Sequence, residues 1–200
     1  LAGGSFGAAD GDGGHFLPGD TLSLTFTLPK DDGSPWGLAE MDAVSLLVSG
    51  PSFNYQRVLA EQSDVSASAV KVGEDTWTYT FPTPIPDTYL PPYNDSPSFD
   101  ADDGELQGEP LLAGTYTVGL YGHWTYSIDG QEYADAGNAA VDFLLGNSPA
   151  LLPREVVTRE NCNQCHVSLR AHGGVRQNVT LCLLCHTSGA EDPNGAVAGG

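Results

Sequence analysis

Short stretches of alternating apolar and polar residues recur along the first three quarters of the chain. Leu22, Leu24, Phe26 and Leu28 alternate with serine and threonine, which is the pattern of a half-buried strand. The same reasoning predicts further strands over residues 44–49, 53–59, 70–72, 77–81, 116–120, 124–128 and 141–145. The run over 44–49 is apolar almost throughout, which indicates a more fully buried strand. Asp129-Gly130 is a strong signal for a hairpin turn.

Seven or eight short strands separated by turns predict a mainly β fold, an immunoglobulin-like antiparallel β-sandwich. Tyr116 lies near the start of a late strand, where such sandwiches carry a tyrosine corner. No cysteine precedes residue 162, so the sandwich has no disulfide. A small C-terminal segment with little regular secondary structure is expected to follow it.

The pattern divides the chain into three parts. Residues 1–14 are rich in Gly and Asp without periodicity and are expected to form a flexible arm; the sandwich covers 15–148, and 149–200 forms a C-terminal segment with a glycine-rich tail. Residues 82–110 interrupt the strands with a long irregular excursion. Its carboxylates, at positions 100, 102, 103 and 105, could hold Ca²⁺, but their spacing does not match the helix-flanked calcium loop.

Composition narrows the possible partners. Against 26 acidic residues there are 7 basic ones, giving a formal net charge of −19, which argues against nucleic acid or anionic lipid as a partner. No apolar stretch is long enough to cross a membrane. The chain begins Leu1-Ala2-Gly3 without an initiator methionine, as expected of an exported protein after removal of its targeting segment.

The C-terminal segment carries the chemistry. Cys162-Asn163-Gln164-Cys165-His166 and Cys182-Leu183-Leu184-Cys185-His186 are both C-x-x-C-H runs, the signature for covalent attachment of haem c. Two thiols at this spacing can form thioethers to the two vinyl groups of one porphyrin, and the next histidine then becomes the proximal ligand of the iron. The sequence therefore predicts two covalent haems, with all four cysteines used.

Two other kinds of protein remain open. The cysteines also fit C-x2-C-x16-C-x2-C, the spacing of a structural zinc site with four thiolates, although a zinc site has no need of a histidine after each pair. The chain would then be an exported binding or adhesion module. Alternatively, a haem iron with an open position would allow a reductase or peroxidase activity.

Two six-coordinate haems need four axial ligands. His166 and His186 supply the proximal pair, and His172 is the best distal candidate, because it cannot easily pass around the first porphyrin but can reach the iron of the second. His15, on the expected arm, and His123, at the junction of two predicted strands, are equal candidates for the fourth. Met41 is the only possible thioether ligand. Bis-histidine ligation leaves no open position, so the predicted protein is an electron carrier and not an enzyme.

The run Arg154-Glu155-Val156-Val157, the two C-x-x-C-H motifs and the His172-Gly173-Gly174-Val175-Arg176 stretch between them resemble the first haem sites of the outer-membrane multihaem cytochromes of the MtrC/OmcA type. The resemblance is close over about residues 150–190. It implies a β domain followed by haems, His166 and His186 as proximal ligands and His172 as a distal one. It also implies electron transfer at the cell surface or outside the cell, with the periplasm as the second choice, to acceptors such as metal oxides.

Members of that family carry further C-x-x-C-H motifs. The chain is therefore expected to act with other haem proteins, as part of a longer haem chain, or with copies of itself in a head-to-tail filament. In a filament, His15 would ligate a haem of the neighbouring molecule.

Overall fold

Two four-stranded antiparallel sheets pack face to face in a computed structural model that describes residues 2–7, 9–30, 32–165 and 167–191. One sheet has the order β1-β2-β6-β5, with strands β1 (Ala2–Phe6), β2 (Ser23–Thr27), β6 (Thr76–Thr80) and β5 (Val70–Lys71). The other has the order β4-β3-β7-β8, with β4 (Gln56–Gln62), β3 (Ala43–Gly50), β7 (Gly114–Ile128) and β8 (Gln131–Leu145). These orders are those of an immunoglobulin-like sandwich, so the predicted fold class is confirmed.

The main core lies between the two sheets. Alternate residues of β2, Leu24 and Phe26, are buried there and face Val118 and Phe143 of the other sheet within one apolar cluster. Tyr116 forms the predicted tyrosine corner, because its hydroxyl donates a hydrogen bond to the carbonyl of Leu112 at 2.6 Å.

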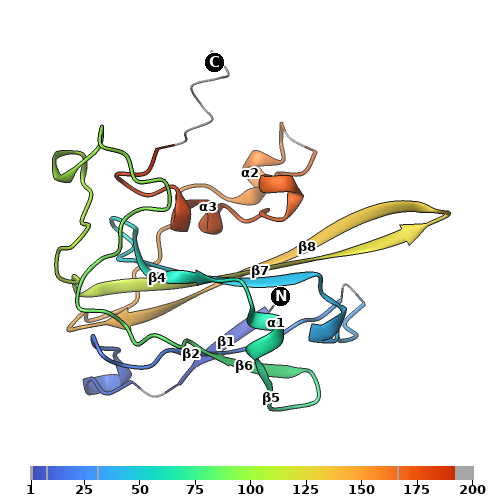
Figure 1. The fold of residues 1–200 in the computed structure, drawn as a ribbon, viewed down its shortest axis with the longest axis horizontal. Coiled ribbons are helices and arrows are strands. Elements are labelled where there is room, and N and C mark those ends of the chain that lie inside the picture. Colours follow the sequence, from blue (N-terminus) through green and yellow to red (C-terminus); the bar gives the residue numbers. More distant parts are fainter. Residues whose placement is uncertain (1, 8, 31, 166, 192–200) are drawn as a thin grey trace.

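The β7–β8 hairpin is longer than the sequence pattern suggests. The two runs predicted at 116–120 and 124–128 form one continuous strand, and all fifteen of its residues pair with β8. Gly122 obscured this continuity; it is a glycine because the inner face is crowded there, and a methyl group would meet Met41 Cε at 3.0 Å. The turn is at Asp129-Gly130 as predicted, with both residues at positive φ. The hairpin extends well beyond the rest of the sandwich (Figure 1).

The N-terminal residues differ from the expected arm. Ala2–Phe6 form β1, which pairs with β2, and Phe16 NH donates to the carbonyl of Leu144 at 2.8 Å. Strand pairing uses backbone groups and needs no apolar alternation, which is why the glycine-rich sequence gave no sign of it. The strand predicted over 53–59 begins only at Gln56, because residues 51–54 form a turn that leaves Phe53 64% exposed.

The C-terminal segment covers the outer face of the β4-β3-β7-β8 sheet. It contains α2 (Arg159–Cys162), the short 3₁₀ turn η4 (His172–Gly174) and α3 (Val179–Cys185). Figure 1 shows these elements on the side of this sheet opposite to β1, β2 and β6. This explains the apolar run over 44–49, because β3 is buried on both faces. No helix in the described ranges is long and apolar enough to span a membrane.

The remaining short elements lie in the connections. They are the helix α1 (Val65–Ser68) and the 3₁₀ turns η1 (Asp12–Gly14), η2 (Leu38–Glu40) and η3 (Ala101–Asp103). The excursion expected over 82–110 is irregular apart from η3 and isolated bridges.

Candidate functional site

The helix α3 is fixed to the sheet by two leucines. Leu181 and Leu184 lie three positions apart on one helical face and are completely buried in a second apolar cluster with Leu47 and Tyr121. Gly119 of β7 lies directly below them, and a methyl group at this position would overlap both leucine side chains. The glycine therefore allows the helix to approach the sheet closely. Asn178 caps the helix by accepting a hydrogen bond from Thr180 NH at 2.8 Å.

Polar bonds fix the segment along the sheet. The Asn138 side chain donates to the carbonyl of Val175 at 2.9 Å and accepts from the backbone NH groups of Gln177 at 2.7 Å and Asn178 at 3.2 Å. Ser49 of β3 donates to the carbonyl of Leu184 at 2.7 Å. Asn138 thus aligns the chain just before α3, and Ser49 holds its last turn.

Arg176 and Glu61 form a charged pair close enough to Cys185 of α3 to affect its pKa. The Arg176 guanidinium stacks over the Tyr121 ring, donates to its hydroxyl at 3.0 Å and lies 3.9 Å from the Glu61 carboxylate. Tyr121 in turn donates to Glu61. Burial raises the pKa of the Tyr121 hydroxyl, which therefore stays protonated at neutral pH.

The irregular excursion reaches over to hold the chain after the second motif. Asn54 bridges the two stretches, donating to the carbonyl of Gly104 at 2.9 Å and accepting from the Ser188 hydroxyl at 3.2 Å. The Glu105 carboxyl is buried against Gly189, where any side chain would overlap it. Burial, followed by the charges of Asp95 and Asp100, raises the pKa of Glu105. We call this contact between residues 94–105 and 187–191 the clamp.

The four cysteines lie in, or just after, the two short helices of the segment. Cys182 and Cys185 lie one turn apart on α3, and burial raises the pKa of Cys185 to about 11. Cys162 is at the end of α2, and Cys165 is exposed three residues later. Within the described ranges, no three His, Cys, Asp or Glu residues are grouped so as to hold a metal ion.

Two of the predicted histidine ligands lie together. The ring centroids of His172 and His186 are 6.1 Å apart, with the planes inclined at 43°. His172 adopts a left-handed backbone conformation, with φ +51°, and begins the turn that returns the chain toward α3. Holding a non-glycine residue in the left-handed backbone region costs about 1 kcal/mol or more, and residues strained in this way are common at functional sites. His166 lies outside the described residues.

The other candidate ligands all lie on the sandwich. His15 is on the sandwich, where its Nδ1 lies 2.8 Å from the carbonyl oxygen of Gly146. His123 lies in the middle of β7, not at a strand junction. Met41 is buried in the main core.

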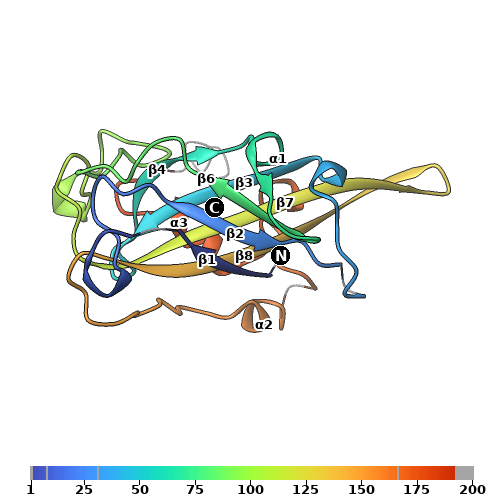
Figure 2. The same cartoon turned by 90° about the horizontal axis from the view of Figure 1, so that it is seen from below.

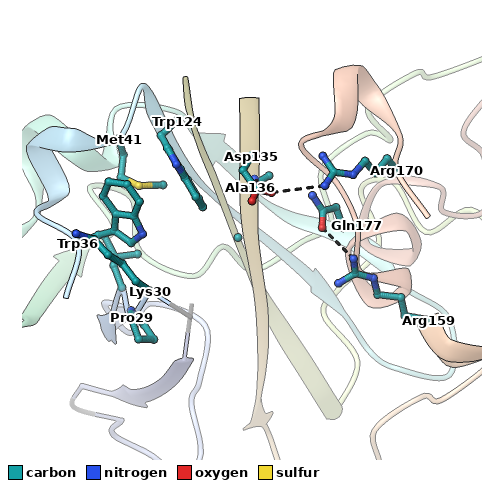
Figure 3. A pocket seen from close by; sticks show the side chains of 12 residues that line it. Pro29, Lys30, Trp36, Met41, Trp124, Asp135, Ala136, Arg159, Arg170 and Gln177 are labelled. Carbon is teal, nitrogen blue, oxygen red and sulfur yellow. Dashed lines mark hydrogen bonds and ion pairs between the residues drawn. The ribbon is translucent and has the colours of Figure 1, made fainter. Parts of the chain in front are cut away.

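Positive charge gathers around the first motif. Three of the seven basic residues of the chain, Lys30, Arg159 and Arg170, line one hollow of about 490 Å³ at the β8 edge (Figure 3). Arg170 pairs with Asp135 at 3.6 Å, and Arg159 donates to Gln177 at 3.1 Å. The ring centroids of Trp36 and Trp124 are 4.8 Å apart, and both rings lie on the other side of β8. The guanidinium groups of Arg159 and Arg170 can hold carboxylates such as haem propionates.

Sequence reasoning missed the residues that dock the segment. Gly119, Asn138 and Glu61 carry no motif, and their roles depend on which face of the sheet they occupy. Asn138 even follows a glycine, a pair that usually signals a turn. The one available signal was the apolar run over 44–49, which indicated a strand covered on both sides.

The C-terminal part of the chain is similar in sequence to known cytochromes. Residues 154–198 match the family model of the outer membrane cytochromes, MtrC/MtrF-like, domains II/IV. A stretch of 55 residues is 42% identical to the multiheme cytochrome MtrC of Shewanella baltica (strain OS185), covering 26% of this chain and 8% of that relative.

Two solved structures share the fold over nearly the whole chain. The crystal structure of MtrC from Shewanella baltica OS185 superposes with a TM-score of 0.61 at 19% identity, over 96% of this chain and 30% of that one. The outer membrane decaheme cytochrome OmcA superposes with a TM-score of 0.55 at 16% identity, again over 96% and 30%. The chain thus spans less than a third of the length of these relatives. The C-x-x-C-H segment is thus similar to the MtrC/MtrF-like outer membrane cytochromes, and nearly the whole chain shares the fold of the MtrC and OmcA structures.

Proposed function

We propose that the chain carries electrons through two covalently bound haem c groups, at the cell surface or outside the cell. In this proposal Cys162 and Cys165 hold one haem, and Cys182 and Cys185 the other. His166 and His186 are the proximal ligands. His172 is the distal ligand of the second haem, so that the two haems are held close together.

The observation that carries the proposal is the spacing of His172 and His186. A metal–imidazole bond is roughly 2.0 Å long, and the ligating nitrogen lies about 1.1 Å from the centre of its ring. Two imidazoles on opposite sides of one iron therefore have ring centres about 6.2 Å apart. The observed 6.1 Å matches this value. Both side chains are exposed, so a porphyrin can reach them.

The anchoring of α3 supports the same assignment. Leu181 and Leu184 fix one face of the helix against the sheet, so Cys182 and Cys185 are held one helical turn apart, an arrangement that suits attachment to the two vinyl groups of one haem. The sandwich thereby holds a haem attached there, and a segment of about forty residues needs little apolar core of its own.

An iron held between two histidines has no open position, so the second haem would pass electrons without binding substrate. The relatives are multiheme and outer membrane cytochromes by name, which supports exchange with other haem proteins and with extracellular acceptors such as metal oxides. We favour a longer haem chain over a homopolymer, because the His15 ring is hydrogen bonded to Gly146 instead of being carried on a free arm.

The test is maturation of the chain in a host that attaches haem c. We expect a mass increase of two haems and a low-spin absorption spectrum. His172→Ala should make one haem high-spin and able to bind CO after reduction, because its sixth position opens. Gln164→Ala, between the cysteines of the first motif, is the matched control and should leave the spectrum unchanged.

A colourless protein that retains zinc would overturn the haem proposal. A reduced wild-type protein that binds CO at the second haem would instead favour a reductase or peroxidase. Electron microscopy of the purified protein tests the homopolymer, which predicts filaments.

A further inference from the structure

We infer that His123 supplies the fourth axial ligand, to the haem attached at Cys162 and Cys165. The inference rests on the proposed function and adds to it a ligand contributed by the sandwich. Its basis is the face of the sheet on which His123 lies, together with the position of the first motif.

The register of β7 places His123 on the outer face. Thr117, Gly119 and Tyr121 all face outward, since Thr117 bonds Tyr55 and the other two contact the C-terminal segment. Gly122 and Trp124 face inward, toward Met41 and Trp36. The pairing of β7 with both neighbouring strands continues through residue 123 without a bulge. His123 therefore lies on the same face as the C-x-x-C-H segment.

Its neighbours leave the imidazole room. The residues directly opposite His123 are Ala43 on β3 and Ala136 on β8, so small side chains flank it on both sides. Large neighbours would have prevented a planar group from approaching the ring. His123 itself is partly exposed.

The first motif lies beside this part of the sheet. The stretch that leads into α2 runs alongside β8, the edge strand (Figure 2). Between this stretch and the sheet is a hollow of about 690 Å³, lined by Ala136 and Asn138 on one side and by Thr158–Glu160 on the other. This volume lies within the range of roughly 300–1,000 Å³ that ligand sites occupy. Open space thus joins the approach to Cys162 with the immediate neighbour of His123.

The position of His15 argues against the alternative. Its partner Gly146 lies ten residues along from Ala136, just past the end of β8, which at about 3.3 Å per residue is on the order of 30 Å from Ala136. Phe16, the next residue, is buried in the main core between the sheets. His15 is therefore at the opposite end of the sandwich from His123.

The experiment compares His123→Ala with His15→Ala in the haem-loaded chain. We expect His123→Ala to convert one of the two haems to high spin, to bind one equivalent of CO on reduction, and to recover its low-spin spectrum with added imidazole. A purely structural role for His123 would not give imidazole rescue. His15→Ala and Thr125→Ala, the next outward residue of β7, should keep both haems low-spin.

A second variant covers the case in which His123→Ala does not fold. His123→Met retains a ligand and should keep both haems six-coordinate while raising the potential of one, as axial methionine does. Two low-spin haems without CO binding in a folded His123→Ala protein would overturn the inference alone, as would the loss of a ligand in His15→Ala. A wild-type protein without two haems would overturn the proposed function as well.

Discussion

Single polar residues fix the register of the C-terminal segment on the sheet. Asn138 uses both ends of its amide, donating to Val175 and accepting from the backbone NH groups of Gln177 and Asn178. An apolar residue at this position would leave three backbone groups without their partner. Such groups cost about 1–3 kcal/mol each when they stay buried.

We therefore expect Asn138→Ala to loosen the chain before α3. Amide hydrogen exchange at Gln177 and Asn178 should accelerate, corresponding to a loss of about 1–3 kcal/mol of local stability. Asn138→Asp is the matched variant, because it keeps the acceptor and replaces the donor to Val175 with a carboxylate oxygen. Equal exchange rates in wild type and Asn138→Ala would show that the amide does not hold the segment.

At the scale of elements, the clamp couples the segment to pH. The pKa of Glu105 is raised in the folded protein, so the fold binds the proton more tightly than the unfolded chain does. The clamp is then most stable below the ordinary pKa of a glutamate. It loses stability as pH rises through the raised folded value.

Glu105→Gln should remove this dependence, since the amide has no proton to lose. In the wild type, exchange protection of Ser188 and Gly189 should decrease as pH rises above 4.5, the ordinary pKa of a glutamate. The rates are first corrected for the intrinsic pH dependence of exchange. The variant should give a flat profile over the same range. Glu109→Gln, on the same excursion, serves as the control. A flat wild-type profile would contradict the prediction.

The elements that the sequence predicted correctly are those whose side chains alternate between core and solvent. The residues from Leu22 to Leu28 and the turn at Asp129-Gly130 carry their own local signals. The strand β1 carries no such signal, because it is held by backbone pairing. The first half of β8 carries none either, because its residues under the C-terminal segment are small or polar. The motif cysteines and histidines were proposed as haem-binding residues from their spacing alone. Only the fold could show that Gly119 and Asn138 receive the segment and on which face His123 lies.

At the scale of the whole molecule, the β4-β3-β7-β8 sheet belongs to two cores. Its inner face packs against the other sheet, and its outer face carries Leu47, Tyr55 and Tyr121 under α3. A fully buried leucine such as Leu47 contributes roughly 1.5–3 kcal/mol. Covering the outer face therefore stabilises the sandwich.

A chain that ends at residue 153 should therefore self-associate. Without residues 154–200, the outer-face cluster becomes an exposed apolar patch on the sheet. Light scattering should show oligomers, and the midpoint of thermal unfolding should fall relative to the haem-free full chain. The same truncation with Leu47→Thr and Tyr121→Thr is the control and should stay monomeric. A truncated chain that is monomeric without these changes would contradict the role assigned to the outer face.

The shared sheet also limits how the two parts of the chain can be recombined. A segment of this kind could not be grafted onto an arbitrary β-sandwich, because the recipient would need a glycine where α3 touches the sheet, an asparagine beside it and a serine under its last turn. A graft that carries only the two motifs would lack the sheet residues that hold the segment in place. The smallest transferable unit is the segment together with the outward-facing residues of β3, β7 and β8.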